Sequence, residues 1–177
     1  MIRMFLLAAA VCVAAPAAAQ NRQPDVIFVP TPQDLVEAML RLADVKKGDV
    51  LYDLGSGDGR IPITAARKYG VRGVGIDIDP ERIKEALENA RKAGVTKLVE
   101  FRLEDLFQSN FREATVVTLY LLPDFNVKLR PRLLAELKPG TRIVSHQFDM
   151  GDWKPEKKLE SNNRVVYFWT IPERKGH

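Results

Sequence analysis

Three glycines at alternate positions follow a short apolar segment in VLYDLGSGDGRIP, residues 50–62. They are Gly55, Gly57 and Gly59, and an acid, Asp53, precedes them. Glycine accepts positive φ angles and lets backbone N–H groups approach a ligand closely. A helix that begins directly after such a loop points its N-terminus at the same ligand. The segment therefore predicts either a loop that holds a nucleotide-like cofactor or a flexible turn between a strand and a helix.

The spacing of these glycines departs from the dinucleotide fingerprint G-x-G-x-x-G. Gly55 and Gly57 match its first two glycines, but Arg60 occupies the third position. Carboxylates at Asp53 and Asp58 would repel a pyrophosphate, whereas a cofactor that carries an ammonium group tolerates them. The pattern favours the amino-acid end of S-adenosylmethionine (SAM) over NAD, and a nicotinamide-dependent oxidoreductase is the more distant alternative.

A second acid follows the next apolar segment, VGIDIDP. A carboxylate at Asp77 can accept hydrogen bonds from both ribose hydroxyls of an adenosine. A helix-capping role belongs better to Asp79, which directly precedes Pro80. Asp105, in RLEDLF, would be placed to accept from the adenine amino group, and its alternative role is an N-cap. The predicted cofactor-binding residues are Asp53, Gly55, Ser56, Gly57, Gly59, Asp77, Ile78 and Asp105.

Helical and extended patterns alternate along the chain that positions these residues. The patterns predict helices at 31–45, 60–70, 79–94 and 123–137, a short helix or turn at 104–111, and strands at 50–54, 73–78, 98–103, 114–121, 142–148, 157–161 and 164–171. Strands separated by helices imply right-handed crossovers and a largely parallel sheet. The last two strands are joined too closely for a crossover and should be antiparallel. We predict an α/β fold with a single doubly wound, Rossmann-like, mostly parallel sheet and an antiparallel C-terminal strand.

The first helix has a recognisable start. Thr31 is predicted as its N-cap, with Pro32 at the first helical position. Leu35, Met39 and Leu42 then share one face.

Composition limits the classes of function. The chain is 46% hydrophobic and 28% charged, which is typical of a folded globular protein. Its net charge of +4 is a mild excess spread along the chain, so it gives no footprint for nucleic acid.

The order DLGSGDGR, VGIDIDP, LEDLF, VVTLYLLP and LKPGTRIVS resembles the motif series of the class I SAM-dependent methyltransferases. More narrowly, FVPTPQDLVEAMLRLA ahead of the glycine loop resembles small relatives of the mitochondrial lysine methyltransferases that act on the ATP synthase c-subunit. The resemblance implies SAM as the cofactor and a protein lysine or similar amine as the acceptor. It also implies that Val29, Pro30 and Thr31 lie near the cofactor and close its pocket.

The acceptor side carries fewer signals. Methyl transfer from a sulfonium needs alignment and no metal, and we predict no metal site. No catalytic residue is assigned: Tyr120 is the candidate, and Asp124 lies near it, but both also fit structural roles. Trp153 would line an acceptor pocket or close the sheet edge, and His146 is interpreted as a core histidine. The Asn/Asp-Pro-Pro-aromatic box of enzymes that methylate bases or glutamine is replaced here by LYLLP.

The chain begins with the pattern of a secretory signal peptide. MIRMFLLAAAVCVAAPAAAQ has a charged start at Arg3, an apolar middle and a small-residue end at Ala19. We therefore predict a signal peptide at 1–19, a methyltransferase domain at 20–177, and export to the periplasm or medium; a retained leader would leave the protein cytoplasmic or membrane-tethered. The single cysteine, Cys12, lies in this leader, so the exported chain would have no disulfide, zinc-thiolate site or cysteine nucleophile.

These patterns together predict a SAM-dependent methyltransferase that N-methylates a protein lysine or similar amine. The alternative is an exported, non-catalytic protein on the same fold that binds an adenosine ligand or a partner. The expected partners are a protein or small-amine substrate, with no nucleic acid and no stable membrane span after leader cleavage; the oligomeric state is not assigned.

Overall fold

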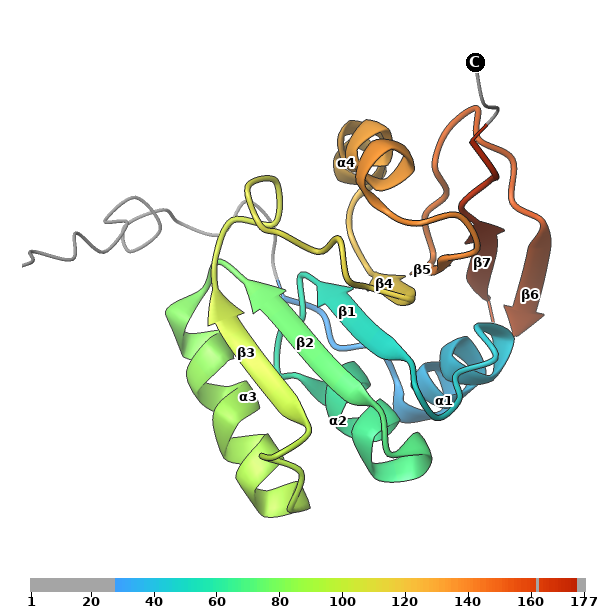
Figure 1. The fold of residues 1–177 in the computed structure, drawn as a ribbon. Coiled ribbons are helices and arrows are strands. Elements are labelled where there is room, and N and C mark those ends of the chain that lie inside the picture. The colour runs from blue at the N-terminus through green and yellow to red at the C-terminus, as the bar shows by residue number, and fades with distance from the viewer. Residues whose placement is uncertain (1–27, 162, 175–177) are drawn as a thin grey trace, which may run out of the picture.

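Seven strands and four helices make up the described part of the chain, residues 28–161 and 163–174, in the computed structural model (Figure 1). The strands are β1 (Val50–Leu54), β2 (Arg72–Asp77), β3 (Val99–Leu103), β4 (Val116–Leu119), β5 (Arg142–His146), β6 (Lys157–Ser161) and β7 (Arg164–Thr170). The helices are α1 (Gln33–Leu42), α2 (Arg60–Tyr69), α3 (Pro80–Ala93) and α4 (Pro123–Glu136). The predicted signal peptide lies outside the described residues.

The strands form one sheet in the order β3-β2-β1-β4-β5-β7-β6. The pairs from β3 to β5 are parallel, whereas β7 is antiparallel to both β5 and β6. The predicted α/β fold with an antiparallel end is confirmed. The chain winds outward from β1 to β3 and then returns to β4 beside β1, so the topological switch point lies between β1 and β4.

Alternate strand residues face two different cores. Leu51, Val116 and Val144 pack with α1 and the start of α2 on one face. Their neighbours Tyr52 and Val117 pack with α4 on the other, in agreement with the two-residue period of a strand. Figure 1 shows α2 and α3 behind β1 to β3, and α4 on the opposite side of the sheet. Strands buried on both faces explain their continuous apolar runs.

One predicted helix start is wrong. Helix α1 begins at Gln33 with Pro32 in the capping position, and no side chain caps it. The Thr31 hydroxyl instead lies 3.2 Å from Nδ1 of His146 on β5, so a tertiary partner takes the oxygen that was expected to cap the helix. The start of α3 is confirmed, because the Asp79 carboxylate accepts from the backbone N–H of Glu81 at 2.8 Å.

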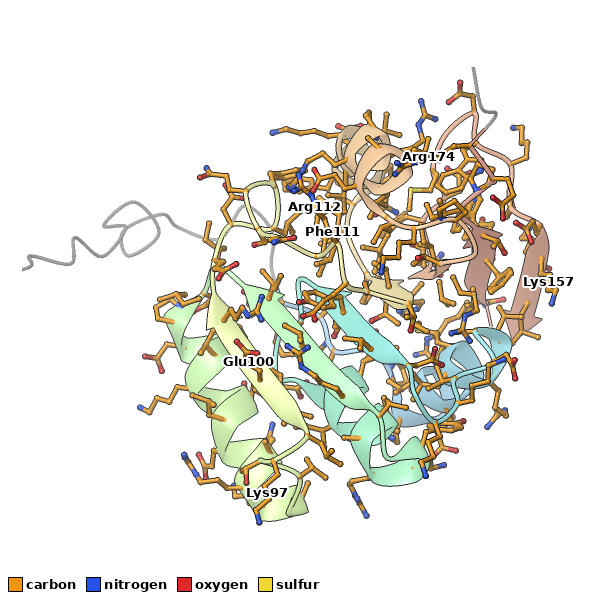
Figure 2. The ribbon with its side chains drawn as sticks, in the orientation of Figure 1. Lys97, Glu100, Phe111, Arg112, Lys157 and Arg174 are labelled. Carbon is orange, nitrogen blue, oxygen red and sulfur yellow. The ribbon has the colours of Figure 1, made fainter. Side chains whose placement is uncertain are left out.

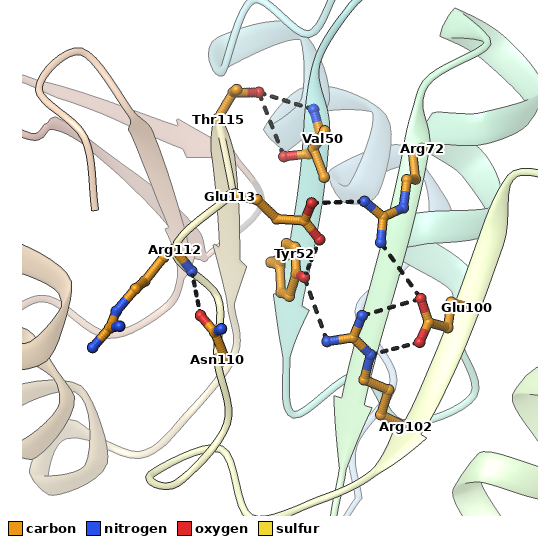
Figure 3. Close-up of polar contacts among 9 residues, drawn as sticks. All are labelled: Val50, Tyr52, Arg72, Glu100, Arg102, Asn110, Arg112, Glu113 and Thr115. Carbon is orange, nitrogen blue, oxygen red and sulfur yellow. Dashed lines mark hydrogen bonds and ion pairs between the residues drawn. The ribbon is translucent and has the colours of Figure 1, made fainter. Parts of the chain in front are cut away.

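The connection between β3 and β4 contains turns and no helix. Its Phe111 (labelled in Figure 2) is fully buried. The Arg132 guanidinium of α4 lies 4.7 Å from the centroid of the Phe111 ring. Polar side chains cover the sheet surface beside this connection (Figure 3). Tyr52 donates to Glu113 at 2.6 Å, and Glu113 accepts from Arg72 at 2.8 Å. Beside them, an ion pair joins Arg102 and Glu100 on β3.

Candidate active site

A cavity of about 300 Å³ opens at the carboxyl ends of the central strands. Its walls come from the segment ahead of α1, the glycine loop, the end of β2, the start of the β3–β4 connection and the residues after β4. This is the place where open α/β sheets bind ligands. Six predicted cofactor residues line it: Asp53, Gly55, Ser56, Asp77, Ile78 and Asp105. Gly57 and Gly59 shape the loop without lining the cavity.

Two of the loop glycines have no room for a side chain. Gly57 has φ +52°, and a Cβ there would lie 2.1 Å from a ring carbon of Phe28. Gly59 has φ +76°, and a Cβ there would lie 2.5 Å from Phe101 and 2.9 Å from the Cβ of Ala86. Both the backbone angle and the close packing therefore require glycine, and the loop brings backbone groups to the cavity at the start of α2.

Asp77 connects the end of β2 to the glycine loop. Its Oδ2 accepts from the backbone N–H of Gly57 at 2.7 Å, and its Oδ1 accepts from that of Asp79 at 3.0 Å. Burial raises the pKa of this carboxyl, and these two backbone donors oppose the rise. Each carboxylate oxygen can accept a further hydrogen bond, so the geometry suits a ligand with two adjacent hydroxyls.

Asp53 is buried at the carboxyl end of β1. Burial, reinforced by the charges of Asp77 and Asp58, raises the pKa of Asp53 to about 8, although Thr118 donates to its Oδ1 at 2.7 Å. A cationic group placed beside Asp53 would reverse this shift, because an opposite charge favours the carboxylate. The site therefore suits a ligand with an ammonium group.

Ser56 is another buried polar residue of the loop. Among the described residues, its hydroxyl finds no hydrogen-bond partner. Since buried polar atoms in native proteins are almost always paired, this hydroxyl fits contact with a polar ligand in the cavity.

Asp105 lies at the cavity and in a turn, so its contact with an adenine amino group stays a prediction, and no helix follows for it to cap in the described β3–β4 connection. It lines the cavity, and its Oδ1 accepts from the backbone N–H of Phe107 at 2.9 Å, as a turn-capping acid does.

The segment ahead of α1 forms another wall. Val29, Pro30 and Thr31 line the cavity, as the family resemblance implied. Phe28, which lies over Gly57, was not predicted from the sequence. The Arg82 guanidinium of α3 lies 4.9 Å from the Phe28 ring centroid.

Arg60 ties the same segment to the glycine loop. It pairs with Asp58 at 2.6 Å and donates to the backbone oxygen of Thr31 at 2.9 Å. Its position directly after the loop was the only sequence signal for this role.

The wall after β4 contains Tyr120, which lies beyond the end of the strand because β4 is shorter than predicted. Its ring lies 3.9 Å, centroid to centroid, from that of His146. His146 is buried, as predicted for a core histidine, and yet it contacts two cavity-lining residues, Tyr120 and Thr31. Burial lowers the pKa of His146 to about 4.

Two other candidates lie away from the cavity. Asp124 is exposed in the first turn of α4. Trp153 packs against the buried Trp169 of β7, an inner strand, and its backbone oxygen accepts from the Trp169 indole at 2.8 Å, so it adds to the core beside β7. In the part of the chain that the structure describes, no cluster of acids, histidines or cysteines is arranged to hold a metal ion. None of the described helices has the length and apolar character needed to cross a bilayer.

Comparisons with known proteins agree with this geometry. Residues 53–157 match the model of the ANTKMT methyltransferase domain. A protein-lysine N-methyltransferase of Saccharolobus islandicus is 47% identical over 157 residues, which cover 86% of this chain and 98% of that protein. A lysine N-methyltransferase of Mus musculus that acts on the ATP synthase c-subunit is 30% identical over 84% of this chain and 60% of its own length.

A solved structure from Salinibacter ruber, described as an RNA methyltransferase in complex with S-adenosylhomocysteine, is 60% identical to this chain. The match has a TM-score of 0.82 and covers 84% of this chain and 97% of that one. Two further methyltransferase structures, from Geobacter sulfurreducens and Thiobacillus denitrificans, also contain S-adenosylhomocysteine. SAM is accordingly the cofactor, and the enzyme is a methyltransferase. This chain belongs to the family defined by the ANTKMT methyltransferase domain.

Proposed function

We propose that this enzyme transfers the methyl group of SAM to the ε-amine of a lysine in a protein. The observation that carries the proposal is the charge of the cavity: its lining includes six acidic residues and two arginines. Such a lining attracts cations and repels phosphate. It suits the sulfonium and ammonium groups of the cofactor, and it attracts a protonated lysine toward the cavity before the amine loses its proton. The 47% identity to a protein-lysine N-methyltransferase over nearly all of that protein supports the same acceptor.

The cofactor would supply an electrophilic methyl group. In the proposed arrangement, Asp77 would accept from the ribose hydroxyls and Asp105 would accept from the adenine amino group. Asp53 faces the amino-acid end, and the loop from Gly55 to Gly59 approaches through its backbone. The ammonium of the lysine would first lose one proton to solvent, and the neutral nitrogen would then form the new C–N bond as the C–S bond breaks with its electron pair moving to sulfur.

The acceptor must reach the methyl group as a neutral amine. A lysine with a pKa of about 10.4 is almost wholly protonated at neutral pH, so the enzyme must favour deprotonation by excluding water from the amine. We assign this role to the wall that contains Tyr120. It is backed by two aromatic rings, those of His146 and Phe148. The acidic residues of the lining lie instead near the end of β1, on the glycine loop, at and after the end of β2, and after β3.

RNA is the second candidate acceptor, because the Salinibacter ruber relative at 60% identity is described as an RNA methyltransferase. Two observations weigh against it here. The chain has 27 Lys and Arg against 23 Asp and Glu, which is a small excess for a protein that binds a polyanion. The acidic lining would also repel a phosphate backbone close to the cofactor.

Transfer of tritium from labelled SAM separates these acceptors. The full chain is incubated with bacterial protein extract and with RNA, and each product is treated with protease or ribonuclease. We expect protease-sensitive label and methyl-lysine in the hydrolysate, with Asp77→Ala as the low-activity control. Label confined to ribonuclease-sensitive product would overturn the lysine assignment. No label in either pool, from a chain that binds S-adenosylhomocysteine, would favour the ligand-binding alternative.

We also propose that the leader at 1–19 exports the protein, which rests on its sequence pattern. Because SAM is made in the cytoplasm, an exported enzyme would need a supply of cofactor. Cell fractionation with N-terminal sequencing tests the proposal. An N-terminus at Gln20 in the periplasm or medium is expected; an intact N-terminus in the cytoplasm would contradict export.

A further inference from the structure

Three segments that are distant in sequence meet at His146. Its imidazole Nδ1 lies 3.2 Å from the Thr31 hydroxyl, ahead of α1, and its ring stands 3.9 Å from the Tyr120 ring, after β4. His146 does not line the cavity, whereas Thr31 and Tyr120 both do. His146 therefore contacts two segments of the cavity wall from outside the cavity, with a hydrogen bond to Thr31 and a ring contact to Tyr120.

The backbone beside His146 has an unusual conformation. Gln147 has φ +69°, which non-glycine residues rarely adopt, and its N–H donates to Val165 of β7 at 2.7 Å. The next residue, Phe148, donates its N–H to the His146 oxygen at 2.9 Å and stacks on Tyr120 at 6.3 Å between centroids. Strained backbone of this kind persists where surrounding contacts hold it, and such positions cluster at functional sites.

Further hydrogen bonds fix the strained segment. Ser145 donates its hydroxyl hydrogen to the backbone oxygen of Phe148 at 2.6 Å. The buried Asn126 amide of α4 donates to the same oxygen at 3.2 Å and to that of Asp149 at 3.1 Å. Residues 147–149 are thus held by hydrogen bonds to β5, β7 and α4. His146 directly precedes them and contacts the two cavity-lining residues.

We propose that His146 is a positioning residue for methyl transfer, which acts by holding Tyr120 in the acceptor wall and Thr31 in the adjoining wall ahead of α1. Its imidazole is neutral at physiological pH, because burial depresses its pKa, so it contributes shape and one hydrogen bond without a charge. This inference deepens the proposed function and rests on it for the placement of the acceptor. The rate of methyl transfer is sensitive to shifts of about 1 Å in the alignment of acceptor and methyl group. A residue that holds the acceptor wall can therefore change kcat without touching the substrate.

A double-mutant cycle tests whether His146 acts through Tyr120. His146→Asn, Tyr120→Leu and the double variant are made in the full chain, and kcat, KM and the Kd for S-adenosylhomocysteine are measured. Asn can keep the bond to Thr31 but removes the ring. We expect His146→Asn to lower kcat about tenfold and to change the Kd for S-adenosylhomocysteine less than threefold. When Tyr120 is already Leu, adding His146→Asn should lower kcat by less than a further twofold, because the two residues act through the same contact. The proposal would be overturned if the effects of the two single variants on kcat multiplied in the double variant. It would also be overturned if His146→Asn left kcat unchanged or lowered kcat and cofactor affinity equally.

A second pair of variants examines the bond to Thr31 and does not depend on the folding of His146→Asn. His146→Phe keeps a ring against Tyr120 but removes the bond, and Thr31→Val removes the same bond from the other side. We expect similar losses of kcat in the two single variants and no further loss in the double variant. Multiplicative losses would contradict the inference, as would full activity in both single variants. Trp153→Phe, which alters an aromatic pair away from the cavity, should keep wild-type kcat.

The acceptor assay separates the two proposals. If tritium enters RNA and not protein, the lysine assignment fails. The two double-mutant cycles can then be measured with RNA as acceptor, so the role of His146 is still tested. If tritium enters lysine and the cycles are multiplicative, only the role of His146 fails.

Discussion

The backbone N–H of Gly57 donates a 2.7 Å hydrogen bond to Oδ2 of Asp77. This bond joins the middle of the glycine loop to the carboxyl end of β2, and both segments border the same cavity. A single carboxylate can thus hold the loop in place and keep lone pairs available for a ligand. Loss of Asp77 is expected to affect both.

Asp77→Ala should weaken binding of SAM and S-adenosylhomocysteine about 10- to 100-fold, since hydrogen bonds to a charged group contribute roughly 1.5–3 kcal/mol. Isothermal titration calorimetry of the full chain measures this. Asp124→Ala removes an exposed acid outside the cavity and should leave the Kd unchanged. Wild-type affinity in a folded Asp77→Ala variant would contradict the ribose assignment.

Cofactor binding should release a proton from Asp53. Its raised pKa, about 8, means that the carboxyl is mostly protonated at pH 7 in the free protein. An ammonium group beside it would lower that pKa, so SAM affinity should rise with pH up to about 8. Calorimetry in buffers of different ionisation enthalpy counts the proton released. Methylthioadenosine lacks the amino-acid end and should release none; equal proton release by both ligands would place the effect elsewhere.

The same raised pKa bears on the stability of the ligand-free chain. Between about pH 4, near the unfolded value, and about pH 8, the folded chain holds a proton on Asp53 that the unfolded chain has lost. Asp53 should therefore lower the free energy of unfolding as pH rises through this window. Urea titrations of wild type and Asp53→Asn over the range should show a steeper decline in the wild type. If the free energies of unfolding of wild type and Asp53→Asn fell in parallel with pH, Asp53 would not be the source of the pH dependence.

Gly57→Ala should weaken cofactor binding more than tenfold, because its methyl group would displace Phe28 from the cavity wall. Gly70→Ala provides a matched control: Gly70 also has positive φ, +66°, but a Cβ there would meet nothing within 4 Å. Both variants should lose about 1 kcal/mol of stability from the backbone conformation. An equal loss of affinity in the two variants would mean that strain, and not the close packing, decides binding.

Tyr52 should make stability depend on alkaline pH. Burial, followed by its hydrogen bond to Glu113, raises the pKa of the phenol to about 12. The unfolded phenol ionises near pH 10, so the stabilising contribution is complete below about pH 10 and is lost as pH rises to about 12. Denaturant unfolding from pH 9 to 12 should show a decline that Tyr52→Phe reduces. An equal decline in that variant would assign the effect to other groups.

The sequence was most informative at positions where the local backbone conformation or a neighbouring helix end requires one particular residue type. Gly57 and Gly59 stand where positive φ and close packing exclude a side chain, and Asp79 caps the helix that it precedes. The alternation of strands and helices was enough to predict the parallel sheet. These features depend on neighbours within a few residues, so a sequence pattern can express them.

Features that depend on distant segments were missed. Thr31 was expected to cap a helix, but its partner is His146, 115 residues away. The role of His146 behind the cavity depends on the ends of β4 and β5 lying side by side, which no local pattern reports. The antiparallel arrangement of the last two strands was predicted, but the position of β7 between β5 and β6 was not.

That strand order has a consequence for folding of the chain. β6 is made before β7 and pairs only with β7, while β5 keeps its outer edge open until β7 arrives. The sheet therefore cannot be completed until β7 inserts between β5 and β6. Until then, β5 and β6 expose the strand edges that β7 later pairs, so this is the stage of folding at which the chain is most exposed to aggregation and to chaperones.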